Sequence, residues 1–386
     1  MTGFNESLGI LVGALTIPPA DPLGYAVPVW ILQALSYLTL TLHFLAMNFT
    51  IGASLLVLWT YIRKQPGYDG VRHFLGSGLP LGVSYIITLG IPPLLFVQVL
   101  YGQLFYSSSV VLGAFWIQVI PAVMAAYGAY YYHKLNRRSR PRLQWLVVLA
   151  SMGLLLWVGY IYVSNLTLSM SPEKWSGIYA QHPGGSILHH GEPSLHPRFL
   201  LFLAGSFAVA GLALIWRGVY LLRWGFEEAG RQSQKLGLRA FLLSPVVWIV
   251  AGAGVYATRT QDLLAMFDHA ATIPLMTIGI VCGLLAVVFA FLSVGRQKAL
   301  FPLVSSVGVT GVIASMVIFR DQARMAYLEP YFQLSSVPVN AQWGMLTIFL
   351  VSLVIGLALL VFLALKVVPK MAEGARERLA GASATR

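Results

Sequence analysis

The sequence predicts an all-α integral membrane protein with about nine transmembrane helices. Of its 386 residues, 58% are hydrophobic and only 10% are charged, a composition that excludes an ordinary soluble globular protein. The strongest apolar run, residues 30–61, contains no Asp, Glu, Lys or Arg. About 20 apolar residues at 1.5 Å each cross the hydrocarbon core, where a helix satisfies its own backbone polar groups. We therefore expect a polytopic helical bundle.

Nine nearly uncharged apolar runs define the expected helices in chain order. They cover residues 29–62, 80–106, 109–133, 143–168, 199–222, 240–258, 271–294, 299–319 and 343–366. Residues 1–28 are expected to precede them outside, at the membrane surface. Spans one to five form a first helical group over 29–222, spans six to nine form a second group over 223–368, and residues 369–386 form a basic tail.

The basic residues predict the orientation of these spans. All but five of the 25 Lys and Arg residues fall on one side of a nine-span arrangement. Short loops rich in Lys and Arg face the cytoplasm, so the C-terminus is expected inside and the N-terminus outside. The net charge of +12 is explained in this way without nucleic acid, since no single domain carries a basic face. We expect a multi-pass protein of the cytoplasmic (inner) membrane, with the lipid bilayer around it.

The longest expected outer loop, residues 169–198, is rich in histidine. It contains His182, His189, His190 and His196. Two adjacent imidazoles do not readily reach one ion, and no thiolate or carboxylate set accompanies them. The Pro and Gly residues around them indicate turns. A metal site and a contact to a quinone or haem edge stay open, but a solvated or partner-contacting loop explains the pattern best.

His43 is the only imidazole in the first span and lies near its middle. An ionisable side chain at that depth costs about 2–3 kcal/mol or more unless something compensates for it. A neutral imidazole is a common axial ligand of haem iron. The alternative is a histidine that is hydrogen-bonded between helices, for example to Asn48.

The first span resembles the first helix of the large subunit of cytochrome bd-type quinol oxidases. The pattern that carries this resemblance is HFLAMNFTIGASLLVL, residues 43–58, and it continues with LFVQVLYG (95–102), LWVGYIYVSNLTLSMSP (156–172) and PRFLLFLAGSFAVAGLAL (197–214). It extends over roughly residues 30–220. The resemblance implies that His43 ligates a b-type haem iron, with Gln98 and Gln118 as further cofactor-binding candidates, and that quinone or quinol is the substrate.

Two departures from the family pattern limit what the resemblance implies. Where the family's fifth helix carries a haem-ligating His, this chain has Leu200, Leu201 and Phe202. Where its third helix carries proton-delivering Glu residues, this chain has Gln118, which cannot titrate. Moreover, the first eight predicted spans contain no Asp or Glu, and oxygen reduction at a buried haem needs groups that carry protons. We do not expect oxygen reduction.

Two polar clusters flank the later spans. Asp268 and His269 stand at the expected outer end of span seven, where they are candidate catalytic acceptors of quinol protons; a capped helix start is the alternative. The segment from Arg320 to Arg324 follows span eight, and we interpret it as an interfacial ion pair with aromatic anchors.

These observations lead to one functional hypothesis with two competitors. We expect an electron-transfer subunit of a multi-subunit respiratory complex that exchanges electrons between membrane quinone and an extracytoplasmic multihaem cytochrome c or iron-sulfur protein. The first competitor is a non-catalytic scaffold that lines a quinone site beside an active homologue. The second is a transporter, although internal repeats and midplane charges are not evident.

Overall fold

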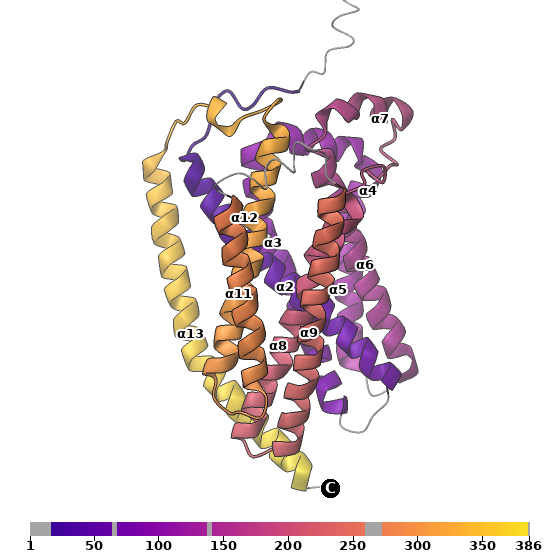
Figure 1. The fold of residues 1–386 in the computed structure, drawn as a ribbon, viewed down its shortest axis with the longest axis vertical. Helices are drawn as coiled ribbons and strands as arrows, with labels where there is room; N and C mark the ends of the chain where they lie inside the picture. The colour runs from indigo at the N-terminus through magenta and orange to yellow at the C-terminus, as the bar shows by residue number, and fades with distance from the viewer. Residues whose placement is uncertain (1–16, 64–67, 137–140, 259–271, 385–386) are drawn as a thin grey trace, which may run out of the picture. The chain divides into compact units, whose positions relative to one another are not determined.

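The structure, a computed structural model, describes residues 17–63, 68–136, 141–258 and 272–384. In these ranges the secondary structure is helical, apart from turns and one isolated bridge between Tyr25 and Val339. Nine of the described helices are long and apolar enough to cross a membrane (Figure 1). The predicted fold class, an all-α polytopic membrane bundle, is therefore confirmed.

The helices follow the predicted order, with several longer than expected. They are α2 (Val29–Arg63), α3 (Tyr68–Val111), α4 (Gly113–Trp116), α5 (Val119–Asn136), α6 (Pro141–Leu168), α7 (Trp175–Gln181), α8 (Leu195–Arg223), α9 (Glu227–Ala257), α11 (Thr272–Ser293), α12 (Leu300–Leu328) and α13 (Trp343–Ala384). The short α4 precedes α5 and forms one candidate span with it. The short α7 lies in the predicted outer loop.

The chain divides into two compact units, one with residues 32–336 and the other with residues 21–31 and 337–386. In the second unit, the backbone N–H of Tyr25 donates to Pro338 O at 2.8 Å, and that of Asn340 donates to Tyr25 O at 2.8 Å. Gly24 has φ +71°, and a Cβ there would collide with the Pro338 carbonyl. The segment before α2 is therefore fixed to the segment before α13.

The first unit is built from helical hairpins around α2. The pairs α5–α6, α8–α9 and α11–α12 pack most extensively, as expected for helices joined by short connections. Helix α2 is the most buried of the candidate spans, with 56% of its most apolar stretch buried. Helices α8 and α9 pack together across residue 222, where we predicted a boundary between two groups; that division stays a prediction.

Small residues bring α2 and α8 into close contact. A Cβ on Gly52 would collide with the carbonyl of Ser206, and one on Gly205 would lie 2.7 Å from Asn48 Nδ2. The Ser206 hydroxyl donates to Asn48 Oδ1 at 2.9 Å. Small residues and single neutral hydrogen bonds are the usual means of packing helices within a membrane. Asn48 thus bonds to α8 and not to His43.

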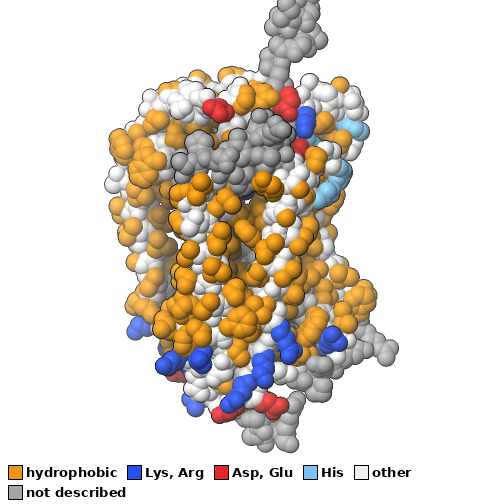
Figure 2. Space-filling model, viewed as in Figure 1, with side chains coloured by type: hydrophobic (Ala, Val, Ile, Leu, Met, Phe, Trp, Pro, Cys, Tyr) orange, Lys and Arg blue, Asp and Glu red, His pale blue; other side chains and the backbone are white. Residues whose placement is uncertain are grey.

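The two ends of the first unit differ in charge. Hydrophobic side chains line the helices on the face shown in Figure 2, and Lys and Arg side chains gather at one end. This end, called the basic end below, includes Arg63, Arg223 and Arg296 at helix termini. Helix α7 lies at the opposite end, called the α7 end (Figure 1). The distribution agrees with a set of spans that cross one membrane.

Candidate functional site

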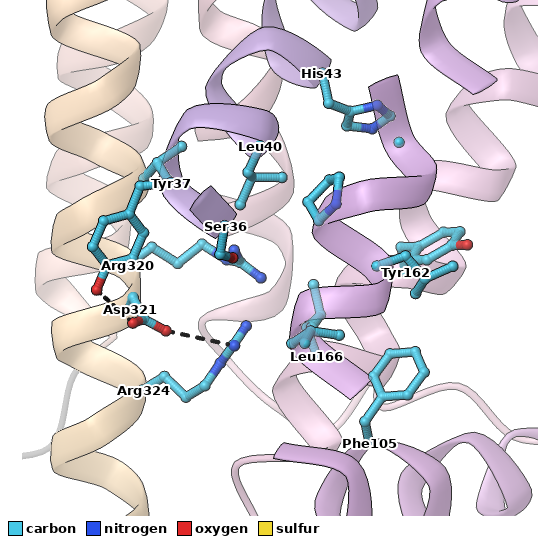
Figure 3. A pocket seen from close by; sticks show the side chains of 15 residues that line it. Ser36, Tyr37, Leu40, His43, Phe105, Tyr162, Leu166, Arg320, Asp321 and Arg324 are labelled. Atoms are coloured by element: carbon cyan, nitrogen blue, oxygen red, sulfur yellow. Dashed lines mark hydrogen bonds and ion pairs between the residues drawn. The ribbon is translucent and has the colours of Figure 1, made fainter. Parts of the chain in front are cut away.

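A cavity of about 100 Å³ lies among α2, α3, α6 and α12 in the half of the bundle nearer the α7 end. Its wall includes His43 and Leu40 from α2, Gly90 and Pro93 from α3, and Asp321 from α12 (Figure 3). Pro92 and Pro93 remove two backbone donors from the middle of α3. Gly90 adds no side chain to this wall, which leaves space between α3 and α2.

His43 is held at one end of this cavity by the backbone of α3. Its Nδ1 lies 3.0 Å from the carbonyl oxygen of Ile86. A carbonyl oxygen can only accept, so Nδ1 carries the proton and Nε2 is left as an acceptor. A Cβ on Gly90 would lie 2.8 Å from His43 Cε1, so glycine at this position lets the ring pack directly against the backbone of α3. The result is an oriented imidazole whose second nitrogen is available to a ligand.

Asp321 forms the other end of the cavity and collects donors from three helices. Its Oδ2 accepts from the Tyr37 hydroxyl at 2.7 Å and from Gln33 Nε2 at 3.4 Å. Its Oδ1 accepts from the Tyr101 hydroxyl at 3.3 Å and lies 3.6 Å from Arg324 Nη1. Asp321 is 7% exposed and Arg324 5%. A buried carboxylate is tolerated where it is paired and hydrogen-bonded.

Helix geometry separates Tyr37 and His43 along α2, and both side chains line the cavity. Tyr37 and His43 are six residues apart, or roughly 9 Å along the helix axis. Tyr101 reaches Asp321 at a bend in α3, where its own backbone leaves the helical conformation (φ −135°, ψ 31°). In Figure 3 the imidazole and the carboxylate stand at separate ends of the pocket. A ligand between them meets different chemistry at each end.

The cavity carries an excess of positive charge. Arg320 and Arg324 both line it, against the single carboxylate of Asp321. Among the described residues Arg324 pairs with that carboxylate, whereas no ion pair or hydrogen bond of Arg320 is found. The Arg320 guanidinium carbon lies 5.8 Å from the centre of the Phe202 ring. An electron-rich or anionic oxygen is the ligand group that such a wall favours.

The expected placement of Asp321 and Arg324 in a loop after the eighth span differs from the structure. We ended the eighth span at residue 319, but α12 continues to Leu328, and both residues are buried within it. The ion pair exists, and it faces Tyr37 and Tyr101 rather than solvent. Asp321 is therefore a carboxylate within a spanning helix that is longer than the predicted span. The i,i+3 spacing of the two charges was the available signal, because such a pair lowers the cost of a charge in a helix.

The other predicted site residues do not meet at this cavity. Gln98 is half-buried in α3, beside the cavity-lining Val97, but does not line the cavity. Gln118 lies between α4 and α5, donates to Ala114 O at 2.9 Å and accepts from Trp157 Nε1 at 3.3 Å. Asp268 and His269 lie outside the described residues, as does the rest of 259–271. The roles of these residues stay predictions.

The histidines of the outer loop divide into two kinds. His189 is buried: its backbone N–H donates to Ser164 Oγ at 2.7 Å, and its Nδ1 lies 3.2 Å from Thr167 Oγ1. Burial and the nearby Lys174 lower the pKa of His189 to about 4. His190 and His196 are exposed, and both contact the Tyr160 hydroxyl. His189 is thus part of the packed structure and not of a solvated loop.

Within the described ranges, no group of three His, Cys, Asp or Glu side chains is arranged to hold a metal ion. Haem iron needs fewer protein ligands than such a group provides. An imidazole that binds a metal usually donates its other ring N–H to a carbonyl or a carboxylate, and His43 is oriented in this way by Ile86 O. The space is less suitable. The cavity of about 100 Å³ is well below the roughly 300–1,000 Å³ of pockets that bury a drug-sized ligand. A porphyrin does not fit between these helices as they stand.

Comparison with known proteins gives no family for this chain. No protein-family model matches the sequence, and no characterised protein matches it significantly. The resemblance to the quinol oxidase subunit accordingly rests on the short helix patterns between residues 30 and 220. Function must be argued from the cavity itself.

Proposed function

We propose that this chain is the quinone-binding subunit of a multi-subunit redox complex in the cytoplasmic membrane. The quinone headgroup occupies the cavity between His43 and the Asp321–Arg324 pair. One observation carries this proposal. His43, whose Nδ1 is bonded to Ile86 O and whose Nε2 is therefore an acceptor, lines a cavity within spanning helices, and the other end of that cavity holds a carboxylate and two guanidinium groups. The basic connectors face the cytoplasm in this proposal, as Lys and Arg in short loops do, and the α7 end faces the redox partner.

The chemistry of the cavity suits one substituted ring. An apolar cavity of about 150 Å³ holds benzene, so side chains around the cavity of about 100 Å³ must move to admit a quinone ring. A quinone has oxygens on opposite sides of its ring. One oxygen meets His43 and the other meets Arg320 and Arg324, whose charge favours an anionic oxygen.

The proposed reaction is the oxidation of quinol, or its reverse. Quinol loses two protons and two electrons and becomes quinone. His43 Nε2 accepts one proton, because its Nδ1–H is already donated to Ile86. The other proton leaves beside Asp321, the only carboxylate on the described cavity wall. The two electrons pass to a haem or iron-sulfur centre of an extracytoplasmic partner, such as a multihaem cytochrome c.

A b-type haem on His43 is a second candidate, and the Nδ1 contact to Ile86 is the observation that favours it. The cavity volume argues against it. A reduced-minus-oxidised optical spectrum of the purified chain distinguishes the two, since haem b gives absorption bands that quinone lacks. Bands that disappear in His43→Ala would favour haem over a quinone at this residue.

The test of the quinone proposal is binding of a ubiquinone or menaquinone analogue to the purified full-length chain. We expect His43→Leu to weaken binding by at least about tenfold, the effect of one lost hydrogen bond to a buried polar group. His182→Leu is the matched control, because His182 lies in the outer loop and lines neither this cavity nor its neighbour. Equal binding by wild type and His43→Leu would refute the proposal.

The test also addresses the scaffold alternative. A scaffold that merely lines a groove beside an active homologue binds the analogue weakly or not at all when purified alone. Tight binding that depends on His43 contradicts that alternative. Electron transfer from quinol to the partner subunit, measured in the intact complex with and without His43→Leu, then shows whether the bound quinone reacts.

A further inference from the structure

A second cavity, of about 70 Å³, adjoins the first and is bounded by α6, α8, α9 and α12. Three guanidinium groups line it, from Arg198, Arg320 and Arg324, and the two arginines of α12 are shared with the first cavity. Much of the remaining wall is apolar, with Leu201 and Phe202 from α8 and further side chains from α9 and α12. No carboxylate lines this second cavity among the described residues.

Arg198 has weak partners for a buried guanidinium. Its Nη2 lies 3.4 Å from the Tyr327 hydroxyl, and its Nη1 lies 4.0 Å from Met170 Sδ. Its Nε is buried and has no hydrogen-bond partner. Sulfur and a neutral hydroxyl do not compensate a positive charge, and an unpaired buried charge is costly. Among the described residues, the Glu192 carboxylate interacts with Arg198 only through its charge, and no carboxylate forms a hydrogen bond or an ion pair with it.

The charges around this cavity do not balance. Of the three arginines, only Arg324 forms an ion pair with a carboxylate among the described residues, that of Asp321. Arg320 contacts the Phe202 ring, a cation–π contact that offsets only part of the cost of burial. Three guanidinium groups on a cavity wall with no carboxylate among its described lining residues form the arrangement expected for a bound anion with several oxygens.

The position of the arginines in their helices indicates where this anion comes from. Arg198 lies three residues after the start of α8, and Arg324 lies four residues before the end of α12. Arg324 is thus roughly 6 Å, and Arg320 roughly 12 Å, from the α7 end of α12. Arginines near a helix end lie close to the level of lipid headgroups and extend toward it. The apolar walls below them suit a hydrocarbon chain.

We propose that this second cavity binds the phosphate of an anionic phospholipid. The phosphate oxygens accept from Arg198 and Arg320, and an acyl chain lies against Leu201 and Phe202. The bound lipid supplies the missing negative charge between α6, α8 and α12. This site shares Arg320 and Arg324 with the proposed quinone site and differs from it in Arg198 and Leu201, which line only the second cavity.

The experiment measures phosphatidylglycerol binding to the delipidated full-length protein in neutral detergent by native mass spectrometry. We expect Arg198→Gln and Arg320→Gln each to weaken binding at least about tenfold, because each removes charged hydrogen bonds. Arg231→Gln is the control: it also removes a guanidinium, but an exposed one at the basic end. Phosphatidylcholine, which has no net charge, should bind at least about tenfold more weakly than phosphatidylglycerol. Equal phosphatidylglycerol binding by all four proteins would overturn the proposal.

Two further measurements identify the ligand and control for misfolding. Leu201→Trp fills the apolar wall and keeps all three charges, so it should weaken lipid binding without changing the unfolding temperature. Inorganic phosphate alone should not displace phosphatidylglycerol; displacement at equal concentration would indicate a small soluble anion and overturn the lipid assignment. Arg198→Gln should bind the quinone analogue as the wild type does, so failure of this proposal and failure of the quinone proposal give different results.

Discussion

Two histidines in spanning helices, one buried and one half-buried, have different surroundings. His133 of α5, near the basic end, is 1% exposed; its Nδ1 lies 3.0 Å from Gln144 Oε1, and its Nε2 lies 2.9 Å from where a Cβ on Gly76 would be. His43 of α2 is held through Nδ1 in a similar way, but it lines a cavity. The first imidazole is enclosed by packing and the second is open to a ligand. Residue type and depth do not distinguish them; their neighbours do.

The buried polar groups around the two histidines also differ. Near the basic end, buried polar groups form neutral pairs, such as Ser54 with Tyr130 at 2.8 Å. Toward the α7 end, the buried polar groups include Asp321, Arg320 and Arg324, and both cavities lie there. Neutral pairs allow helices to pack tightly, whereas ionised groups need several partners and keep space for them. The first region holds the bundle together and the second provides the candidate site.

The largest expected effect comes from removing the charge of Asp321. Asp321→Asn leaves Arg320 and Arg324 without a described carboxylate, and breaking a buried ion pair costs about 3–5 kcal/mol. We expect a large fall in the unfolding temperature in detergent, or a protein that does not accumulate. The control is Asp69→Asn, since the Asp69 side chain is 85% exposed in its pair with Arg72, and such pairs contribute about 0–1 kcal/mol. A similar fall in the unfolding temperature of both variants would show that the buried ion pair contributes no more stability than the exposed one.

A matched pair of glycine substitutions tests the enclosed and the open histidine directly. A Cβ on Gly76 would lie 2.9 Å from His133 Nε2, and one on Gly90 would lie 2.8 Å from His43 Cε1. Gly76→Ala should destabilise the protein by about 1–3 kcal/mol, because the enclosed ring cannot move. Gly90→Ala should cost less than about 1 kcal/mol, because His43 can shift into the cavity. Thermal unfolding measures the stability of both variants. An equal loss of stability in the two would contradict the difference between the enclosed His133 and the open His43.

The smallest expected effect is a pH dependence from His189, an enclosed histidine outside the spans. Its pKa is lowered to about 4 from an ordinary 6.5 by burial and by the charge of Lys174. A base with a lowered folded-state pKa contributes its full stability above 6.5 and loses it as pH falls toward 4, because the unfolded chain binds the proton first. Between pH 7.5 and 5.5 the loss should be about 1.4 kcal/mol.

Unfolding temperatures at pH 7.5 and 5.5 measure this effect, and His189→Gln, which cannot titrate, is the control. The nearby carboxyl of Glu192 does not interfere in this window. Burial alone would raise its pKa, but hydrogen bonds from Ser194 and Lys174 keep the pKa below its usual value of 4.5. If wild type and His189→Gln lose the same stability, another group is responsible for the pH dependence.

The sequence by itself determined the fold class, the number of spans and the importance of the first helix. Long apolar runs have one stable solution in lipid, since each backbone polar group must be satisfied within its own helix.

Only the tertiary structure decided which polar groups share a cavity. Tyr37 and Asp321 are 284 residues apart, and Asp321 was assigned to an outer loop because hydropathy ends a span where charges begin. A charge can enter a span when partners from other helices compensate it, and those partners are set by packing that local sequence does not encode. For the same reason, the sequence-based prediction placed His43 within a span and Arg198, Arg320 and Arg324 outside the spans. In the folded chain these four residues lie around two adjoining cavities.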